Sequence, residues 1–298
     1  MLVTGLNGFT GVHLSTVLTK AGFEVHGTIK ADESADERHH VADLDDLGAL
    51  RDVVRRVRPT HVVHLAAISL VSHDDVQEIY RTNIVGTRNL LSALANSDAA
   101  RETLSAVLLA SSANIYGNTD IEPIDEAEPA HPANDYAVSK LAMEHMARLW
   151  SARLPLTIVR PFNYTGVGQS LQFLIPKIVR AFAHRMPELE IGNIDVERDF
   201  SDVRDVVGAY RALLESSERG TFNICSGRAV SLREILRLCE EFTGHSLTLR
   251  VNPALVRANE VARLRGSNVR LRQLLPTWEP RPIRETVRWM IENSAISP

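Results

Sequence analysis

The residues best able to do chemistry are Tyr136 and Lys140, which lie four positions apart in the segment Tyr136-Ala-Val-Ser-Lys140. On a helix this spacing places both side chains on one face, one turn apart. A phenol titrates at about pH 10, but a neighbouring ammonium favours the phenolate and so lowers that pKa. The pair is therefore a candidate proton donor to a ketone, or proton acceptor from an alcohol. The alternative is a half-buried tyrosine beside a solvated lysine, because this spacing also arises by chance.

The composition is that of an ordinary globular protein that has room for one large domain or two moderate ones. The chain has 298 residues, is 44% hydrophobic and carries a net charge of -4. This balance argues against nucleic acid or an anionic membrane as a partner, and no apolar run is long enough to span a bilayer. Cys225 and Cys239 have no metal-ligand spacing, so we expect no metal and no disulfide. Because a strand pattern begins at Leu2, we expect no signal or transit peptide and a cytoplasmic protein.

A glycine-rich turn near the N-terminus predicts a dinucleotide site. Residues 1–4 form a strand pattern, residues 5–11 contain three glycines, and helical spacing follows. In such a motif the first two glycines allow a tight turn and close approach to a pyrophosphate at the helix N-terminus, and the third allows the helix to pack on the strand. The expected cofactor contacts in this turn are Gly5, Asn7, Gly8, Phe9, Thr10 and Gly11.

The next two strands bear on the choice of cofactor. Enzymes that prefer NAD place an acid at the end of the second strand, residues 23–29, to bind the ribose 2'-hydroxyl. Lys30 stands there, and a cation suits a 2'-phosphate, so we predict NADPH, with NADH as the alternative; Lys30 is otherwise a solvated lysine. Asp43 either binds the adenine amino group or caps the following helix. The remaining expected cofactor contacts are Leu44, Leu65, Ala66, Ala67 and Asn83, together with Tyr136 and Lys140.

The hydrophobic pattern predicts an α/β fold. Up to residue 160, strands and helices alternate five times, which is typical of a Rossmann-type, doubly wound parallel sheet. One long helix is expected over 74–95 and another over 136–152, with Leu149 facing inward. After Pro161 the pattern loosens, and residues 198–205 are expected to open a helix. We therefore predict a cofactor domain over 1–160, to which 197–226 return, and a smaller, partly discontinuous α/β substrate lobe over 161–196 and 227–298.

Together these motifs resemble the extended short-chain dehydrogenase/reductase family. The resemblance rests on the three glycines, on Ser112 at a strand end, and on the Tyr136/Lys140 pair about two dozen residues later. It extends over essentially the whole chain, and it implies that Ser112, Tyr136 and Lys140 are catalytic. A non-catalytic dinucleotide-sensing protein is the alternative from another class, and the complete catalytic set argues against it.

Within that family the chain is most similar to the nucleotide-sugar branch, especially GDP-4-keto-6-deoxy-D-mannose reductases and GDP-mannose 4,6-dehydratases. The similar segments include 160–163, 166–169, 198–203, 223–227 and 251–253. The resemblance implies that Arg198 meets the diphosphate, although a surface pair with Asp199 is the alternative. It also implies that Arg257 and Glu260 hold the nucleotide ribose. The other residues expected to contact the substrate are Ala113, Asn114, Asn163, Gln169 and Lys177.

The residues after Ser112 discriminate between reactions. Dehydratases of this family need an acid and a base there, whereas Ala113 and Asn114 transfer no proton at neutral pH. Reduction of a 4-keto sugar and NAD-dependent 4-epimerisation remain. The missing acid after the second strand and the GDP-sugar-like segments favour reduction of GDP-4-keto-6-deoxy-D-mannose to GDP-D-rhamnose. UDP or dTDP sugars and a talose-type product stay open. The family also commonly forms a homodimer through helices near 77–95 and 136–150, which we expect here.

Overall fold

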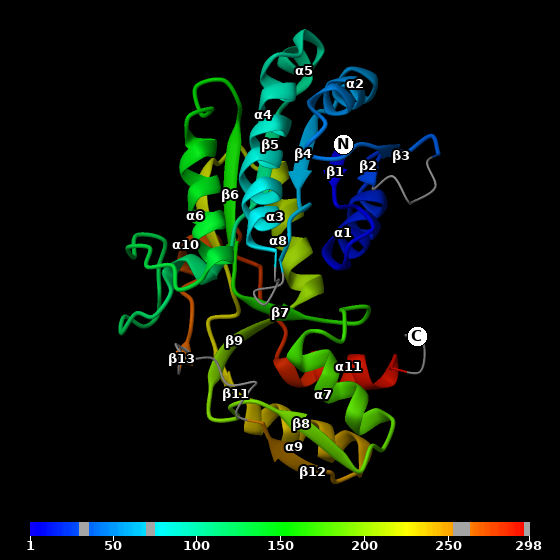
Figure 1. The fold of residues 1–298 in the computed structure, drawn as a ribbon, viewed down its shortest axis with the longest axis vertical. Helices are drawn as coiled ribbons and strands as arrows, with labels where there is room; N and C mark the ends of the chain where they lie inside the picture. Colours follow the sequence, from blue (N-terminus) through cyan, green and yellow to red (C-terminus); the bar gives the residue numbers. More distant parts are fainter. Residues whose placement is uncertain (30–35, 70–74, 253–262, 295–298) are drawn as a thin grey trace. The chain divides into compact units, whose positions relative to one another are not determined.

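The computed structural model describes residues 1–29, 36–69, 75–252 and 263–294 (Figure 1). Within it the chain divides into two compact units. Unit 1 consists of Met1–Gly117, Pro129–Pro161 and Val207–Phe222, and unit 2 of Asn118–Glu128, Phe162–Val206 and Asn223–Pro298. Each unit has a hydrophobic core of its own.

A seven-stranded sheet with the order β10-β6-β5-β4-β1-β2-β3 forms the centre of the α/β fold. The registered pairs from β6 across to β3 are all parallel. The chain reverses direction across the sheet between β1 and β4, and in open α/β sheets ligands bind at such a point, beyond the carboxyl ends of the strands. The strands are β1 (Leu2–Thr4), β2 (His26–Ile29), β3 (His39–Val41), β4 (His61–His64), β5 (Ala106–Ala110), β6 (Leu156–Pro161) and β10 (Gly220–Ile224).

Helices flank this sheet (Figure 1). On one face α2, α4 and α6 lie side by side, and the apolar side chains of these helices and of the strands form the core of unit 1. The helices of this part are α1 (Phe9–Lys20), α2 (Leu47–Val57), α3 (Val76–Tyr80), the π-helix η1 (Arg81–Gly86), α4 (Thr87–Ala95), α5 (Asp98–Thr103), the 3-10 helix η2 (Ala113–Tyr116), α6 (Asp135–Arg148) and α8 (Val203–Glu215).

Unit 2 is built on smaller sheets. In the first, β9 pairs with β7, β11 and β13, and in the second β8 pairs with β12. The strands are β7 (Asn163–Thr165), β8 (Glu188–Ile191), β9 (Glu197–Asp202), β11 (Ala229–Ser231), β12 (Thr248–Val251) and β13 (Arg263–Leu264). The helices are α7 (Leu174–Ala183), α9 (Leu232–Thr243), α10 (Val269–Leu274) and α11 (Ile283–Glu292). Residues of α7, α9 and α11 supply most of its core.

The structure confirms the parallel α/β fold, corrects three local predictions and adds one strand. Residues 197–202 form strand β9, and the helix expected to open at 198 begins only at Val203. The expected helix over 74–95 consists of α3, η1 and α4. Helix α6 ends at Arg148. Leu149 is its C-cap and keeps a helical backbone, but it is 82% exposed and does not face inward. Strand β3 was not predicted, because its three residues are mostly polar and only partly buried.

In the described parts of the chain, no helix has both the length and the apolar character that crossing a membrane requires.

Candidate active site

The structure brings Lys140, Tyr136 and the end of strand β5 together in unit 1. Asn134 caps helix α6 by accepting a hydrogen bond from the Ala137 amide, which places Tyr136 in the first turn. One turn later, Lys140 Nζ lies 5.9 Å from the centre of the Tyr136 ring. The same nitrogen donates to the Ala110 carbonyl at 2.9 Å, two residues before Ser112. The sequence-predicted pair therefore lies beside the strand end that carries the predicted hydroxyl.

Burial controls the charge of Lys140. Its side chain is enclosed, and burial lowers the pKa of the ammonium to about 8, although the charge of Glu144 opposes this shift. A lysine with this pKa is mostly protonated at neutral pH but loses its proton in mildly alkaline solution. Its charge is therefore sensitive to the groups around it.

Ser112 is oriented to donate a hydrogen bond. It caps the 3-10 helix η2, and its Oγ accepts from the Asn114 amide at 3.1 Å. A hydroxyl has one hydrogen to donate. Among the described residues no acceptor takes that hydrogen, so it is available for an oxygen outside the protein. Ala113 and Asn114 follow in η2, and neither carries an acid or a base.

A directed chain of hydrogen bonds fixes the tautomer of His64 at the end of β4. Thr87 Oγ1 donates to the Asn83 carbonyl at 2.7 Å, so it accepts from His64 Nε2 at 2.8 Å. His64 Nδ1 then carries no proton and accepts from Thr4 Oγ1 at 2.7 Å, while Thr4 Oγ1 itself accepts from the Ala66 amide. His64 is therefore neutral, and burial first, then the charge of Lys140, lower the pKa of its imidazole to about 3.

Asn83 in the π-helix ties α6 to the segment after β4. Its side-chain nitrogen donates to Ser139 Oγ at 2.9 Å and to the Ile68 carbonyl at 3.1 Å, and its oxygen accepts from the Ile68 amide. Ser139 in turn donates to the Tyr136 carbonyl. Both N–H donors are used within the protein, so the bonds of Asn83 position α6. Its contact with a cofactor stays a prediction.

The three glycines of the N-terminal turn have different reasons for being glycine. Gly5 has a φ of 72°, and a Cβ there would lie 2.9 Å from the Ala66 amide nitrogen. A Cβ on Gly11 would lie 2.3 Å from the carbonyl oxygens of both Gly5 and Leu6. Gly8 caps α1 without a side-chain hydrogen bond, and a Cβ there would meet only the Gly5 oxygen, at 3.3 Å. Packing within the protein thus explains Gly5 and Gly11, whereas the space at Gly8 suits a ligand beside the helix N-terminus.

The other predicted cofactor contacts lie near this turn or outside the described residues. Leu65, Ala66 and Ala67 follow β4, next to β1, and are half-buried. Asp43 does not cap α2, because Asp46 does so; the Asp43 carboxylate accepts from the Asp45 amide. Lys30 lies outside the described residues. Asn7, Phe9 and Thr10 occupy the turn and the start of α1, and Leu44 is buried where α4 packs.

In unit 2, Arg198 does not form the alternative surface pair with Asp199. Asp199 is fully buried and accepts from Ser226 and from the Gly227 and Gly266 amides, so its carboxylate joins β9 to two other segments. Arg198 donates to the Glu197 carbonyl and remains half-buried.

The remaining predicted substrate contacts in unit 2 occupy several elements. Lys177 on α7 donates to the Glu190 carbonyl, and Gln169 bonds with Thr165 and the Tyr164 carbonyl. Asn163 begins β7 and is exposed. Arg257 and Glu260 lie outside the described residues.

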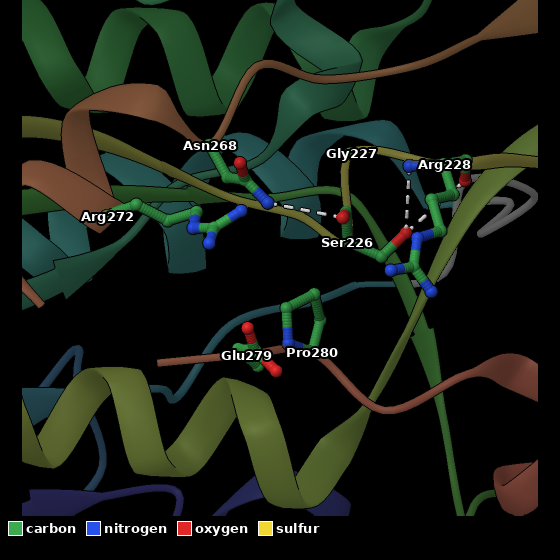
Figure 2. A pocket seen from close by; sticks show the side chains of 7 residues that line it. All are labelled: Ser226, Gly227, Arg228, Asn268, Arg272, Glu279 and Pro280. Carbon is green, nitrogen blue, oxygen red and sulfur yellow. Dashed lines mark hydrogen bonds between the residues drawn. The ribbon is translucent and has the colours of Figure 1, made fainter. Parts of the chain in front are cut away.

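Unit 2 also has a polar cavity of about 250 Å³ that the sequence did not predict (Figure 2). Arg272 and Arg228 extend toward it from opposite sides in this view, and Glu279 lies below them. The Asn268 side chain closes its upper edge by donating to the Ser226 carbonyl at 3.1 Å. None of the predicted substrate contacts that the structure describes lines this cavity.

Sequence analysis overlooked Glu144, which lies one turn beyond Lys140 on α6. Its side chain has no exposed surface and binds Arg160 and Ser111. The signal was present, because residues 136, 140 and 144 repeat every four positions and so continue along one helix face. A charge on an inward face needs a buried partner, and Arg160, the charged residue of the buried strand β6, is that partner.

Comparison with known proteins finds nucleotide-sugar enzymes that are similar to nearly the whole chain. The family model described as GDP-mannose 4,6 dehydratase matches residues 2–290. A GDP-6-deoxy-D-mannose reductase of Pseudomonas aeruginosa is 36% identical, with 98% of this chain and 96% of the relative covered. A GDP-6-deoxy-D-talose 4-dehydrogenase of Aggregatibacter actinomycetemcomitans is 33% identical, covering 92% and 90%.

Solved structures are similar over nearly the whole chain. A provisionally named epimerase from Burkholderia cenocepacia is 46% identical and superimposes with a TM-score of 0.93, covering 99% of this chain and 98% of that one. A structure of RMD from Pseudomonas aeruginosa complexed with NADPH is 32% identical with a TM-score of 0.83, covering 98% and 97%.

The neutral His64 predicts an acid-sensitive contribution to stability. Its pKa is about 3 in the folded protein and 6.5 in the unfolded chain, so only the unfolded chain takes up this proton as the pH falls below 6.5. The contribution of neutral His64 to the free energy of unfolding is therefore complete above pH 6.5 and declines toward pH 3. Between pH 7 and pH 5 this contribution falls by about 2 kcal/mol. We expect His64→Gln to be less stable at pH 7 but to lose about 2 kcal/mol less over that interval, measured by urea unfolding. Parallel pH dependences in the two proteins would contradict the neutral state assigned to His64.

Proposed function

Because the chain belongs to the GDP-mannose 4,6 dehydratase family, we propose that it is an NAD(P)H-dependent reductase of the 4-keto group of a nucleotide-linked 4-keto-6-deoxy sugar. The substrate we favour is GDP-4-keto-6-deoxy-D-mannose. The position of Lys140, beside the Tyr136 ring and on the Ala110 carbonyl, carries the proposal. Relatives named for 6-deoxymannose and for 6-deoxytalose support a GDP sugar. These two sugars differ in configuration at C4, so the proposal covers both product stereoisomers.

The residues of α6 and β5 are suited to protonating a ketone oxygen. The dinucleotide, when bound, supplies the hydride that reduces the carbonyl carbon. Tyr136 gives the phenol proton to the oxygen, and the Lys140 ammonium stabilises the phenolate that remains. Ser112 donates its free hydroxyl hydrogen to the same oxygen and so stabilises the negative charge that develops there. The product is the alcohol, with one proton taken from Tyr136.

The N-terminal turn suits a dinucleotide. The space beside Gly8 and the uncapped N-terminus of α1 would accept a pyrophosphate, with the backbone at Gly5 and Ala66 close by. We favour NADPH, with NADH as the alternative, because a relative of known structure carries NADPH. Lys30 is our candidate for the 2'-phosphate.

Dehydration is disfavoured by the two residues that follow Ser112. The side chains of Ala113 and Asn114 transfer no proton at neutral pH, so the acid and base for removing water are lacking at these positions. Epimerisation is the second candidate, because a similar solved structure bears that name. An epimerase returns the hydride to its own substrate, whereas a reductase consumes one reduced nicotinamide for each product.

The first prediction separates these reactions. The protein with NADPH and GDP-4-keto-6-deoxy-D-mannose should lose absorbance at the reduced-nicotinamide band, with one NADPH oxidised for each alcohol formed. Tyr136→Phe removes the proton donor and should lower kcat by about 100-fold or more. The reactions are followed by absorbance, and the product is identified by chromatography against both C4 isomers. Interconversion of a GDP-hexose without consumption of NADPH would establish the epimerase instead.

A second prediction uses two neighbouring glycines as a matched pair. Gly8→Ala adds a methyl group 3.3 Å from the Gly5 carbonyl oxygen, a tight contact that a small backbone shift relieves, and this methyl group enters the space assigned to the pyrophosphate. It should keep the Tm within a few degrees while raising the Kd for NADPH by about tenfold or more. Gly11→Ala places its methyl group against two carbonyl oxygens and should lower the Tm strongly. Calorimetry measures both quantities, and unchanged NADPH affinity in Gly8→Ala would remove Gly8 from the cofactor site.

We also propose a homodimer formed through the helices near 77–95 and 136–150. Helices α3 and α6 pack against each other, and large apolar side chains are exposed on or beside them. These are Val76, Val85, Val138 and Leu149.

We expect light scattering to give twice the mass of the chain. A Val85→Glu/Leu149→Glu variant should give the single mass, because two carboxylates would be buried at the contact. Val269→Glu, at another exposed apolar position, is the control and should remain dimeric. A wild-type protein of single mass would disprove the dimer.

A further inference from the structure

Glu144 is a buried charge that the proposed reaction does not use. Its carboxylate accepts two hydrogen bonds from Arg160, from Nε at 2.9 Å and from Nη2 at 2.8 Å. Ser111 Oγ donates to it at 2.6 Å and Arg148 at 2.9 Å. Burial alone would raise the pKa of this carboxyl, but the bonds and charges of Arg160, Ser111 and Arg148 outweigh burial and lower it. Glu144 is therefore ionised at neutral pH.

The Glu144–Arg160 pair holds both ends of the Ser112 segment. Ser111 immediately precedes Ser112 and is bonded directly to Glu144. Tyr116 ends the 3-10 helix that Ser112 begins, and its hydroxyl accepts from Arg160 Nη1 at 2.9 Å. The segment that presents the Ser112 hydroxyl is thus fixed to α6 and β6 by charged hydrogen bonds, which are stronger than neutral ones.

The same carboxylate acts on Lys140. The two residues are four apart on one helix, and the charge of Glu144 works against the burial that lowers the pKa of Lys140. Among the described residues, His64 on β4 is the other titratable group coupled to this ammonium, and it is neutral. Tyr136 faces it from the preceding turn. Arg148 on α6 and Arg160 on β6 bind Glu144 and temper its charge.

We propose that Glu144 is a positioning residue that keeps Lys140 in its ammonium form and fixes the Ser112 segment on α6, without touching substrate or cofactor. The inference rests on the reductase activity proposed above. It means that the pH range of the reaction is set by a carboxylate that has no exposed surface.

The experiment measures kcat against pH for charge-altering variants. Under this proposal, activity falls at alkaline pH because Lys140 loses its proton. Glu144→Gln keeps the shape of the side chain and removes its charge, so this alkaline limb of the profile should move to lower pH by about one unit. Glu144→Asp keeps the charge and should restore most of that displacement. Ser111→Ala loses one bond but leaves Glu144 ionised, so its profile should keep the wild-type limb while kcat falls. A purely structural role would lower kcat equally at every pH, and an unmoved limb in Glu144→Gln overturns the proposal.

Glu144→Gln leaves Arg160 unpaired, and the variant could fail to fold for that reason. A second variant tests the proposal independently of that outcome. Arg148 is 43% exposed, and Arg148→Gln removes a cation from Glu144 without burying a charge. The stronger field of Glu144 should then move the alkaline limb to higher pH, opposite in direction to Glu144→Gln. No movement, or movement to lower pH, overturns the proposal.

A readout without turnover keeps the two proposals distinguishable. The Tyr136 phenolate is followed by ultraviolet difference absorbance between each protein and its Tyr136→Phe derivative. In Glu144→Gln, Lys140 loses its charge at lower pH, so the onset of that phenolate should move to higher pH. In Arg148→Gln, Lys140 keeps its charge to higher pH, so the onset should move to lower pH. An inactive wild-type protein with these displacements would disprove the reductase and support the role of Glu144. An active wild-type protein whose variants lack these displacements would support the reductase and disprove the role of Glu144.

Discussion

The buried ammonium of Lys140 is the constraint on which the rest of the site depends. A lysine out of water is costly unless hydrogen bonds and charge compensate it. The Ala110 carbonyl supplies a bond and Glu144 supplies the opposing charge. Because a second cation would raise the cost further, the neighbouring His64 has to be neutral, and its two threonine partners enforce this. The protonation states around α6 are therefore mutually determined.

This constraint also accounts for how α6 is attached to the sheet. Apolar packing on the core fixes the helix in a general way, but it does not fix a side chain to a few tenths of an ångström. Two polar connections do so on either side of Lys140: Asn83 binds Ser139, and Glu144 binds Ser111. The π-helix that contains Asn83 is a rare element of a kind often found at functional sites. It displays the Asn83 side chain toward Ser139 and its carbonyl toward Thr87.

The parts that the sequence predicted are those whose partners are close in the chain. The glycine turn and the Tyr136/Lys140 pair are recognised by spacing within one turn or one helix. The ties between Ser111 and Glu144, and between Arg160 and Tyr116, join residues 33 and 44 positions apart, which no local period reveals. The charged residues of β9 predict a helix start because they resemble an N-terminal turn. In the structure they lie in a sheet, where Asp199 is buried and accepts from Ser226 in the β10–β11 turn.

The identity of position 113 bears on which of the related reactions this site can carry out. Ala113 is 2% exposed at the start of η2, directly after Ser112. A carboxylate at that position would be removed from water and would cost several kcal/mol unless a cation or donors met it. The nearby cation, Lys140, already donates to the Ala110 carbonyl and lies in the field of Glu144. A second acid would compete for the same charge, so an enzyme that needs only one proton donor is better served by a small apolar residue here. The neutral pair at 113 and 114 is thus the arrangement that a reductase centred on Tyr136 requires.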